Sequence, residues 1–302
     1  MAISRAQLLK ELEPGLNALF GMEYERYGDE HTEIYSLETS NKAYEEDVKL
    51  SGFGAAQVKE EGAPTQFDSA QEAWSVRYVP QVISMGFAIT EEAMDDNLYD
   101  SLSKRYTKAM AYSMAYTKQV KAAEILNNGF SSFQTGDGVS LFNDAHPLNF
   151  GGSNANRPTV ATDLNETSLE QAVIDIADYR DDRNLPIAVR PMKLILPAAL
   201  QFVAARLLSS NLRVSTADND INALRSTSAI PEGYVINHYL SDPTSWYLKT
   251  SATDGFKYFQ RKAMQSKMDG DFDTGNVRYK ASERYSFGVT EPLAMYASKS
   301  SY

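Results

Sequence analysis

The sequence contains no cysteine and only three histidines among its 302 residues. Without cysteine there can be no disulfide bond, thiolate nucleophile or cysteine-ligated metal. His31, His146 and His238 lie far apart, and none has the spacing that places two metal ligands on one helix face. A Gly-x-Ser-x-Gly elbow and a glycine-rich phosphate loop are also missing. The sequence therefore predicts no catalytic residue, no metal site and no cofactor.

Basic clusters and long apolar runs are absent as well. The net charge is −11, and the lysines and arginines are scattered without a block of five or six. A protein that wraps nucleic acid needs a basic surface, so this class is disfavoured. The N-terminal stretch lacks the apolar core of a signal peptide, and no run reaches membrane-spanning length. We therefore expect no membrane partner and assembly in the cytoplasm.

The acidic segment near residue 270 resembles two known sites but matches neither. Asp269, Asp271 and Asp273 have the spacing of a calcium loop, but its sixth position is Thr274 and its twelfth is Lys280. Asp273 also begins an Asp-Thr-Gly tripeptide, as in aspartic proteases, which need two such carboxylates. Only one copy is present, so a catalytic site would require a homodimer. A turn between two strands explains the same residues without chemistry.

The strongest positive feature is a run without glycine or proline from residue 91 to residue 128. As a single helix it would be about 57 Å long at ~1.5 Å per residue. Such a helix exceeds one ordinary core, so we expect another copy of the chain to cover part of it. We expect these residues to form its core-facing stripe: Met94, Leu98, Leu102, Ala109, Met110, Ser113 and Val120. Asp96, Lys104, Lys108 and Lys118 should then face outward.

The segments before this run look unable to fold alone. Residues 1–43 predict two short helices separated by Pro14 and Gly15, which need a surface to lie on. Residues 44–90 have a loose period-two pattern and predict a long hairpin with its tip near 60–64. A two-stranded hairpin is marginal in water, so it should rest on a neighbour. The 18 tyrosines fit either this view, because tyrosine is enriched at protein interfaces, or an ordinary role as core residues.

The rest of the chain predicts a mixed middle and a strand-rich end. Helices are expected at 168–183 and 198–209. Strands are expected at 192–196, 234–240, 246–249, 256–259, 276–281 and 284–289. The glycine- and asparagine-rich stretch 129–158 is too long for an ordinary connection and predicts a structured functional loop. The fold class is therefore α+β.

This order of arm, hairpin, long helix, mixed middle and strand-rich return resembles the major capsid proteins of tailed bacteriophages, which have the HK97-like fold. Within that group the sequence resembles the Mu-like prophage major head subunit family. Four blocks in the same order carry the resemblance: GDGVSLF at 136–142 with AHPL at 145–148, TADNDINA at 216–223, PEGYV at 231–235, and GDFDTGN at 270–276 with ERYSFG at 283–288.

The resemblance implies a division of the subunit into four regions. These are an N-terminal arm at 1–43, an E-loop at 44–90, a P-domain with the spine helix at 91–158 and 257–302, and an A-domain at 159–256. It also implies inter-subunit contacts. We expect Trp74 and Tyr78 of the E-loop to pack against a neighbouring subunit. We expect Asp218, Asn219, Asp220 and Asn222 to lie toward the capsomer axis, where they can cap a short helix or bond across subunits.

The implied function is that of a major capsid protein, with no enzyme activity. It would self-assemble into hexamers and pentamers of an icosahedral virion shell that encloses double-stranded DNA without sequence-specific binding. A portal is expected as a partner, and scaffold or decoration proteins are possible ones. The alternative is an encapsulin-like compartment that encloses a cargo enzyme, which would share every feature of the fold. An aspartic hydrolase built on a single copy or two copies of Asp273 is a third hypothesis.

Overall fold

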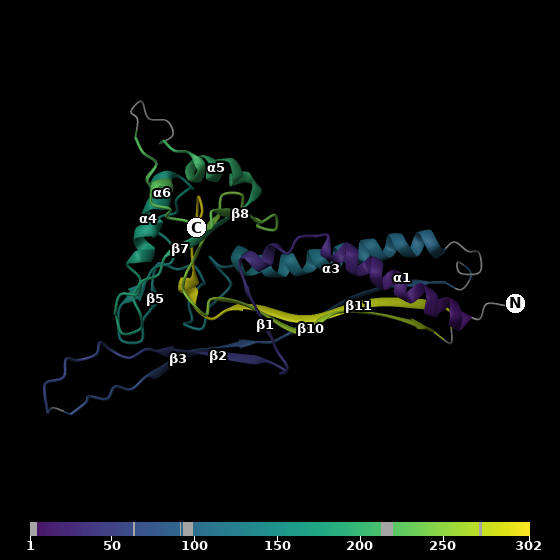
Figure 1. Ribbon diagram of the computed structural model, residues 1–302, viewed down its shortest axis with the longest axis horizontal. Coiled ribbons are helices and arrows are strands. Elements are labelled where there is room, and N and C mark those ends of the chain that lie inside the picture. Colours follow the sequence, from purple (N-terminus) through teal and green to yellow (C-terminus); the bar gives the residue numbers. More distant parts are fainter. Residues whose placement is uncertain (1–4, 63, 91, 93–98, 213–219, 272–273) are drawn as a thin grey trace.

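The computed structural model describes residues 5–62, 64–90, 92, 99–212, 220–271 and 274–302, with the side chains of 5–12 and 99–102 left out. The molecule is elongated, with its N-terminal part at one end (Figure 1). Two helices and a sheet run along its length, a second α/β unit stands at the other end, and a hairpin projects below that unit. This arrangement has the expected α+β class.

The first sheet has the strand order β1-β10-β11-β4. β1 (Ser36–Thr39) pairs in parallel with β10 (Phe256–Gly270), which pairs with β11 (Val277–Val289), and β11 pairs with β4 (Gln81–Ile89). The sequence predicted two strands at 276–281 and 284–289 where the structure has the single strand β11. Ser282 and Glu283 lay outside the two predicted strands, but both have partners in the ladder.

The long helix α3 (Tyr99–Asn127) covers one face of this sheet and contacts β11. The part of the expected helix that holds Met94 and Leu98 lies outside the described residues. Of the expected stripe, Met110 is buried as predicted, whereas Ala109 and Val120 are exposed, so the prediction was wrong for these two. The buried stripe is Ser103, Thr107, Met110, Ala111, Met114, Ala115, Lys118, Gln119, Ala122, Ala123, Ile125 and Leu126. Two of its polar members have partners inside the subunit, since Lys118 pairs with Glu283 and Gln119 contacts His31. Polar residues on the buried face concealed the helical period.

The N-terminal helix α1 (Arg5–Glu25) lies against α3 and the same sheet. The sequence predicted a break at Pro14, but one helix runs through it. Pro14 and Gly15 face solvent, while Leu16 and Phe20 are buried against α3 and β11. Packing of these two side chains outweighs the local cost of proline, which is about 3 kcal/mol in a helix interior. A 3-10 turn, η1 (Glu30–Glu33), then leads into β1.

The second unit is built around a sheet of order β12-β9-β7-β8. Its strands are β7 (Pro191–Leu196), β8 (Tyr234–Ile236), β9 (Trp246–Thr250) and β12 (Met295–Ser298). The helices are α4 (Glu166–Ala177), α5 (Gln201–Ser209), which follows the 3-10 turn η2 (Ala198–Leu200), and the short α6 (Ala223–Ser226). Trp246 and Leu248 are fully buried in the core that this sheet shares with α4 and α5.

Three connections tie the units together, one of them the short segment 251–255 between β9 and β10. Residues 128–165 form an ordered loop region that includes the small pair β5 (His146–Pro147) and β6 (Ser153–Asn154). The 3-10 turn η3 (Pro292–Ala294) leads from β11 into β12. The range 257–302, expected to belong with the long helix, therefore contributes β10 and β11 to the first sheet and β12 to the second.

The hairpin consists of β2 (Glu45–Ser51) and β3 (Gln71–Tyr78), paired antiparallel. Its turn at 61–62 agrees with the expected tip. Only part of the range 44–90 belongs to it, because β4 leaves the hairpin and becomes the outer strand of the first sheet.

Candidate inter-subunit surfaces

The hairpin loop is the most exposed apolar segment of the described chain. Residues 52–62 and 64–70 have no strand partner among the described residues and run beyond the body of the molecule (Figure 1). Phe67 is 96% exposed, Val58 is 97% exposed and Phe53 is 63% exposed. Large apolar side chains that a subunit cannot cover itself mark a contact site for another molecule.

Ion pairs fix the base of the hairpin to the body. Lys49 on β2 lies 2.6 Å from Glu291, and Lys257 on β10 lies 2.7 Å from Asp47 on β2. Burial would lower the pKa of Lys257, but its hydrogen bonds to Asp47 and Asp254 outweigh this and raise it above its usual value. These contacts hold the hairpin at a defined angle while its loop remains uncovered.

Arg183 supports the far side of the hairpin. Its guanidinium donates to the backbone carbonyls of Gly52 at 3.2 Å and Ser69 at 2.6 Å, one on each side of the hairpin. The same group lies 3.9 Å from the centre of the Phe150 ring. Arg183 was not singled out from the sequence, where a single arginine in a polar stretch gives no signal.

Trp74, an expected interface residue, is half-buried within its own subunit. Its indole N–H donates to the carbonyl of Thr290 at 3.3 Å, and the ammonium of Lys49 lies 4.3 Å from its ring centre. The indole also lies so close to Gly136 that a Cβ there would overlap it. Trp74 therefore joins the hairpin to the 129–158 loop, and a contact of its remaining surface with a neighbour stays a prediction.

Tyr78 was expected to pack mainly against a neighbouring subunit. That expectation was wrong, because Tyr78 is only 2% exposed within its own subunit. Its ring lies 4.8 Å from that of Phe259, and its hydroxyl lies 2.5 Å from the hydroxyl of Thr290. Gly288 lets the ring approach β11. The reason is that β3 leads directly into the sheet here, so the last residue of the strand belongs to the subunit core.

The polar loop of the second unit is described only in part. Asp218 and Asn219 of this loop lie outside the described residues, and Asp220 is exposed. Asp273, in the turn after β10, also lies outside the described residues. Asn222 is buried, and its side-chain oxygen accepts from the backbone N–H of Arg225, which caps α6. Its amide also donates to the carbonyls of Leu207 and Ser210. Asn222 thus fulfils the capping alternative, while a role of this loop at an interface stays a prediction.

A buried cluster organises the 129–158 loop. His146 lies 2.6 Å from Asp137 through Nδ1 and 3.1 Å from the Asn156 side-chain oxygen through Nε2. The Asn156 amide donates to the carbonyls of Leu141 and Pro292. Burial would raise the pKa of Asp137, but hydrogen bonds from His146 and Thr135 outweigh it and hold that pKa below its usual value. Both ring nitrogens of His146 face structural oxygens, so this cluster shapes the loop.

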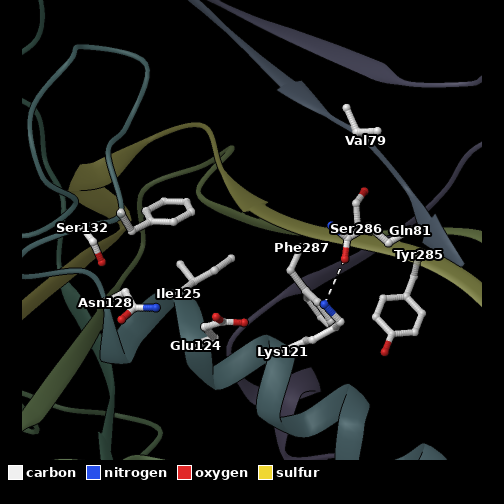
Figure 2. A pocket seen from close by; sticks show the side chains of 11 residues that line it. Val79, Gln81, Lys121, Glu124, Ile125, Asn128, Ser132, Tyr285, Ser286 and Phe287 are labelled. Carbon is white, nitrogen blue, oxygen red and sulfur yellow. Dashed lines mark hydrogen bonds between the residues drawn. The ribbon is translucent and has the colours of Figure 1, made fainter. Parts of the chain in front are cut away.

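A cleft opens where the hairpin meets the first sheet (Figure 2). It lies between the segment that enters β4, the last turns of α3, the following loop and β11, and it holds about 280 Å³ of free space. Its apolar lining comprises Val79, Ile125, Phe133, Tyr285 and Phe287, and its polar lining comprises Gln81, Lys121, Glu124, Asn128, Ser132 and Ser286. Sequence reasoning missed this cleft, because its lining comes from three distant parts of the chain, near residues 80, 121–133 and 286.

Tyrosines form an exposed row on the outer side of α3. The Tyr112 ring lies 4.9 Å from that of Tyr27 and 6.2 Å from that of Tyr116, which lies 5.8 Å from that of Tyr239. Tyr112 and Tyr116 are each about half exposed. Their spacing of four residues is the signal that could have shown this row in the sequence.

Among the residues with described positions, no group of three or more histidine, aspartate or glutamate side chains could hold a metal ion. In the same part of the chain, no helix has the length and apolar character needed to span a bilayer.

Comparison with known proteins gives a family. A family model described as "Phage capsid protein" matches residues 71–298, about three quarters of the chain. No curated protein matches the sequence.

Solved structures share the fold. The procapsid of bacteriophage JBD30 matches with a TM-score of 0.50 at 14% identity, covering 98% of this chain and 76% of that one. The capsid of a native GTA particle matches with a TM-score of 0.52 at 14% identity, covering 90% and 89%. The holo-SrpI encapsulin complex from Synechococcus elongatus matches with a TM-score of 0.55 at 9% identity, covering 91% and 89%. The structure therefore has the HK97-like fold.

Proposed function

The chain belongs to the phage capsid protein family, and from this premise we propose that it closes, as pentamers and hexamers of itself, into an icosahedral shell around double-stranded phage DNA. It is a major capsid protein, which self-assembles into a shell and is a component of the virion. The proposal concerns the geometry of the shell, its contents and its other partners.

The observation that carries the proposal is the hairpin with its uncovered loop. Phe67 and Val58 are almost fully exposed, while ion pairs at Lys49 and Lys257 hold the base of the hairpin in place. A fixed protrusion that docks elsewhere on an identical molecule makes a head-to-tail contact. Such contacts close into rings when the rotation between neighbours allows it. Pentamers and hexamers are rings of this kind.

We propose that the four regions expected from the sequence act separately in the shell. Within the expected E-loop at 44–90, the hairpin reaches a neighbouring subunit while β4 stays in the first sheet, and the arm at 1–43 packs on its own subunit through α1 and β1. The P-domain at 91–158 and 257–302 carries the long helix. The A-domain at 159–256 lies around the capsomer axis, with the loop that contains Asp220 and Asn222 toward the axis. The fixed hairpin base and the exposure of Asp220 support this assignment.

We further propose that the shell is structural rather than catalytic and assembles in the host cytoplasm. A portal would be one partner, and scaffold or decoration proteins would be others. The net charge of −11 supports enclosure of DNA without tight binding, because a lining that held phosphates firmly would oppose packaging and release.

The test is to purify particles from cells infected by the phage that encodes the chain, and to treat them with nuclease. Electron micrographs should show closed icosahedral particles containing this chain, and nuclease-protected double-stranded DNA should be recovered from them. Particles that contain the chain but protect no DNA at any stage would contradict the proposed contents.

The encapsulin-like compartment is a second candidate, supported by the TM-score of 0.55 to an encapsulin. At 9% identity that likeness concerns the fold alone, whereas the family model points to phage capsids. Particle contents separate the two candidates, because a compartment would yield a stoichiometric cargo enzyme in place of protected DNA.

A further inference from the structure

We propose that the open face of the first sheet binds an acidic, extended segment of a separate protein. The inference rests on the proposed function, since it gives the chemistry by which the shell would hold one of its protein partners. The helices α1 and α3 cover one face of this sheet, and the end of β3 packs against part of the other (Figure 1). Away from the hairpin, this second face carries a group of cations that we call the basic face: Lys262, Lys267, Arg278, Lys280 and Arg284.

The strand register places these five side chains on one face. Direct partners in an antiparallel ladder have their side chains on the same side of the sheet. Lys262 is the partner of Arg284, and Lys267 is the partner of Lys280. Arg278 lies two residues from Lys280 on β11, so its side chain faces the same way. The alternate residues of this part of β11 point inward and are buried: Tyr279, Ala281 and Glu283.

Like charges stand directly opposite each other on the basic face. The Cβ atoms of cross-strand partners lie about 4.5–5.5 Å apart, and like charges in such a pair destabilise a sheet. Two pairs have this arrangement, Lys267 with Lys280 and Lys262 with Arg284. Only an uncharged row separates the two pairs, formed by Gln265, Ser282 and Ser84. An anion bound over these pairs would replace their repulsion by attraction.

The lysines of this face lack the partners that lysines have elsewhere in the subunit. The chain has 40 aspartates and glutamates for 29 lysines and arginines, so carboxylate partners are plentiful. Lys42 and Lys193, for example, each lie within hydrogen-bonding distance of a carboxylate. Lys262, Lys267 and Lys280 are exposed and form no ion pair with any described residue. The basic face therefore keeps its charge available for a partner from outside the subunit.

The spacing along β11 matches an extended acidic peptide. Arg278 and Lys280 are two residues apart, which is about 7 Å of strand, and Arg284 lies a further even number of positions along. Acidic residues at alternate positions of an extended chain repeat at the same interval, so each can face a cation. Arg278 also pairs with Asp271, and Arg284 donates to the carbonyl of Pro80, which holds both guanidinium groups in place. Donors that are already fixed lose less conformational freedom when a ligand binds.

Nucleic acid fits this face less well. Proteins that bind single strands stack the bases on aromatic side chains, whereas the neighbouring strand β4 presents Val82, Ser84 and Ala88 on this face. A DNA duplex carries one charge per ~1.7 Å and binds broad basic surfaces. The basic face is one strip on a subunit of net charge −11, and Asp269 lies directly opposite Arg278. A short acidic peptide can lie within the strip and avoid the surrounding carboxylates.

Fluorescence anisotropy tests the proposal with a labelled peptide of alternating glutamate and serine. The unaltered soluble subunit should bind this peptide, and Lys267→Gln/Lys280→Gln should raise the Kd about tenfold, because two charged contacts are lost. The matched control is Lys59→Gln/Arg206→Gln, which changes the net charge equally at exposed positions on the hairpin loop and on α5. The control should change the Kd by less than about twofold, since salt screens distant charges.

No binding to the unaltered subunit, or equal weakening by both double variants, would overturn the proposal. Tighter binding of a DNA duplex of equal charge would overturn the choice of a polypeptide. If Lys267→Gln/Lys280→Gln does not fold, carbodiimide coupling of the peptide to the unaltered subunit decides. Mass spectrometry should then find the links at Lys262, Lys267 or Lys280, and links spread over other exposed lysines would contradict the basic face.

The same peptide separates this proposal from the proposed function. Assembled shells should bind it as the soluble subunit does. Loss of binding on assembly would mean that neighbouring subunits cover the basic face, which overturns its role toward a partner of the shell. Failure of the unaltered chain to form shells would overturn the proposed function, while the measurement on the soluble subunit still decides the chemistry of the face.

Discussion

Lys118 on α3 and Glu283 on β11 form a buried ion pair, with 2.8 Å between the ammonium nitrogen and a carboxylate oxygen. The side chains are 7% and 1% exposed, and the Tyr24 hydroxyl of α1 donates to the same oxygen at 3.1 Å. Burial raises the pKa of Glu283, and its hydrogen bonds to Lys118 and Tyr24 only partly oppose this. One carboxylate thus joins both helices to the sheet.

Lys118→Met should destabilise the subunit by about 3–5 kcal/mol, because it leaves the Glu283 carboxylate buried without its partner. Denaturant unfolding of the soluble subunit measures this loss. The control is the double variant Lys118→Met/Glu283→Leu, which should be close to the unaltered subunit or more stable, since no buried charge remains. Equal loss in the single and double variants would show that the pair does not act as a unit.

This pair also explains the main errors of the sequence prediction. The long helix and its packing on the final strands were predictable, since α3 does contact Tyr279 and Tyr285 through its core side chains. The buried face of the long helix was not predictable, because Lys118 was assigned to the solvent-facing side. Glu283 likewise suggested a gap between two strands. A buried charge can be recognised from sequence only when its partner is known, and this partner is distant in the chain.

Gly136→Ala should displace the Trp74 indole, because the added Cβ would overlap the ring. Overpacking of this kind costs about 1–3 kcal/mol. In a Trp74→Ala background the same change should cost almost nothing, and a double-mutant cycle on the soluble subunit measures the difference. Additive losses in the cycle would mean that the two residues do not contact each other.

Trp74→Ala should also impair shell closure more than subunit folding. Trp74 is half-buried and helps to fix the hairpin base, where its indole donates to Thr290. The yield of closed particles and the unfolding midpoint of the soluble subunit are the two measurements. If both fall together, Trp74 contributes only to the internal core.

Asp137→Asn should destabilise the subunit near neutral pH by about 1–3 kcal/mol, since it removes a charged acceptor from His146. The folded-state pKa of Asp137 lies below the unfolded value of about 3.9. Its stabilisation is therefore complete above that value and is lost as the pH falls through the folded-state pKa. The difference between variant and unaltered subunit should shrink from pH 6 toward pH 2.5.

Asp144→Asn is the matched control for this pH series. Asp144 lies in the same loop but is more exposed and 3.6 Å from Arg157. Its removal should cost less than about 1 kcal/mol. A difference for Asp137→Asn that stays constant across the acid range would contradict the assigned role of its carboxylate.

Ala109→Pro should abolish assembly and give insoluble protein. It removes a backbone donor in the middle of α3 and clashes with the preceding turn, at a cost of about 3 kcal/mol or more. Ala109 is exposed, so Ala109→Gln, which keeps the helix, serves as the control and should assemble normally. Soluble yield and particle counts measure both variants. Normal shells from the proline variant would mean that the helix is not continuous at this point.

The candidate surfaces were predictable to different degrees. The exposed hairpin loop followed from its glycines and its position before a long helix. The burial of Tyr78 in its own subunit could not be predicted, because nothing in the sequence shows that the strand enters the sheet core at that residue. The cleft was out of reach for the same reason, since Val79, Ile125 and Phe287 meet only through the tertiary fold.

Sedimentation velocity of the purified, unaltered protein tests the central claim most directly. It should be run over a range of protein and salt concentrations, with electron micrographs of the fastest species. The account predicts rings and closed shells that sediment far ahead of the subunit. A single species of 33.6 kDa under every condition, including the highest concentration, would contradict it.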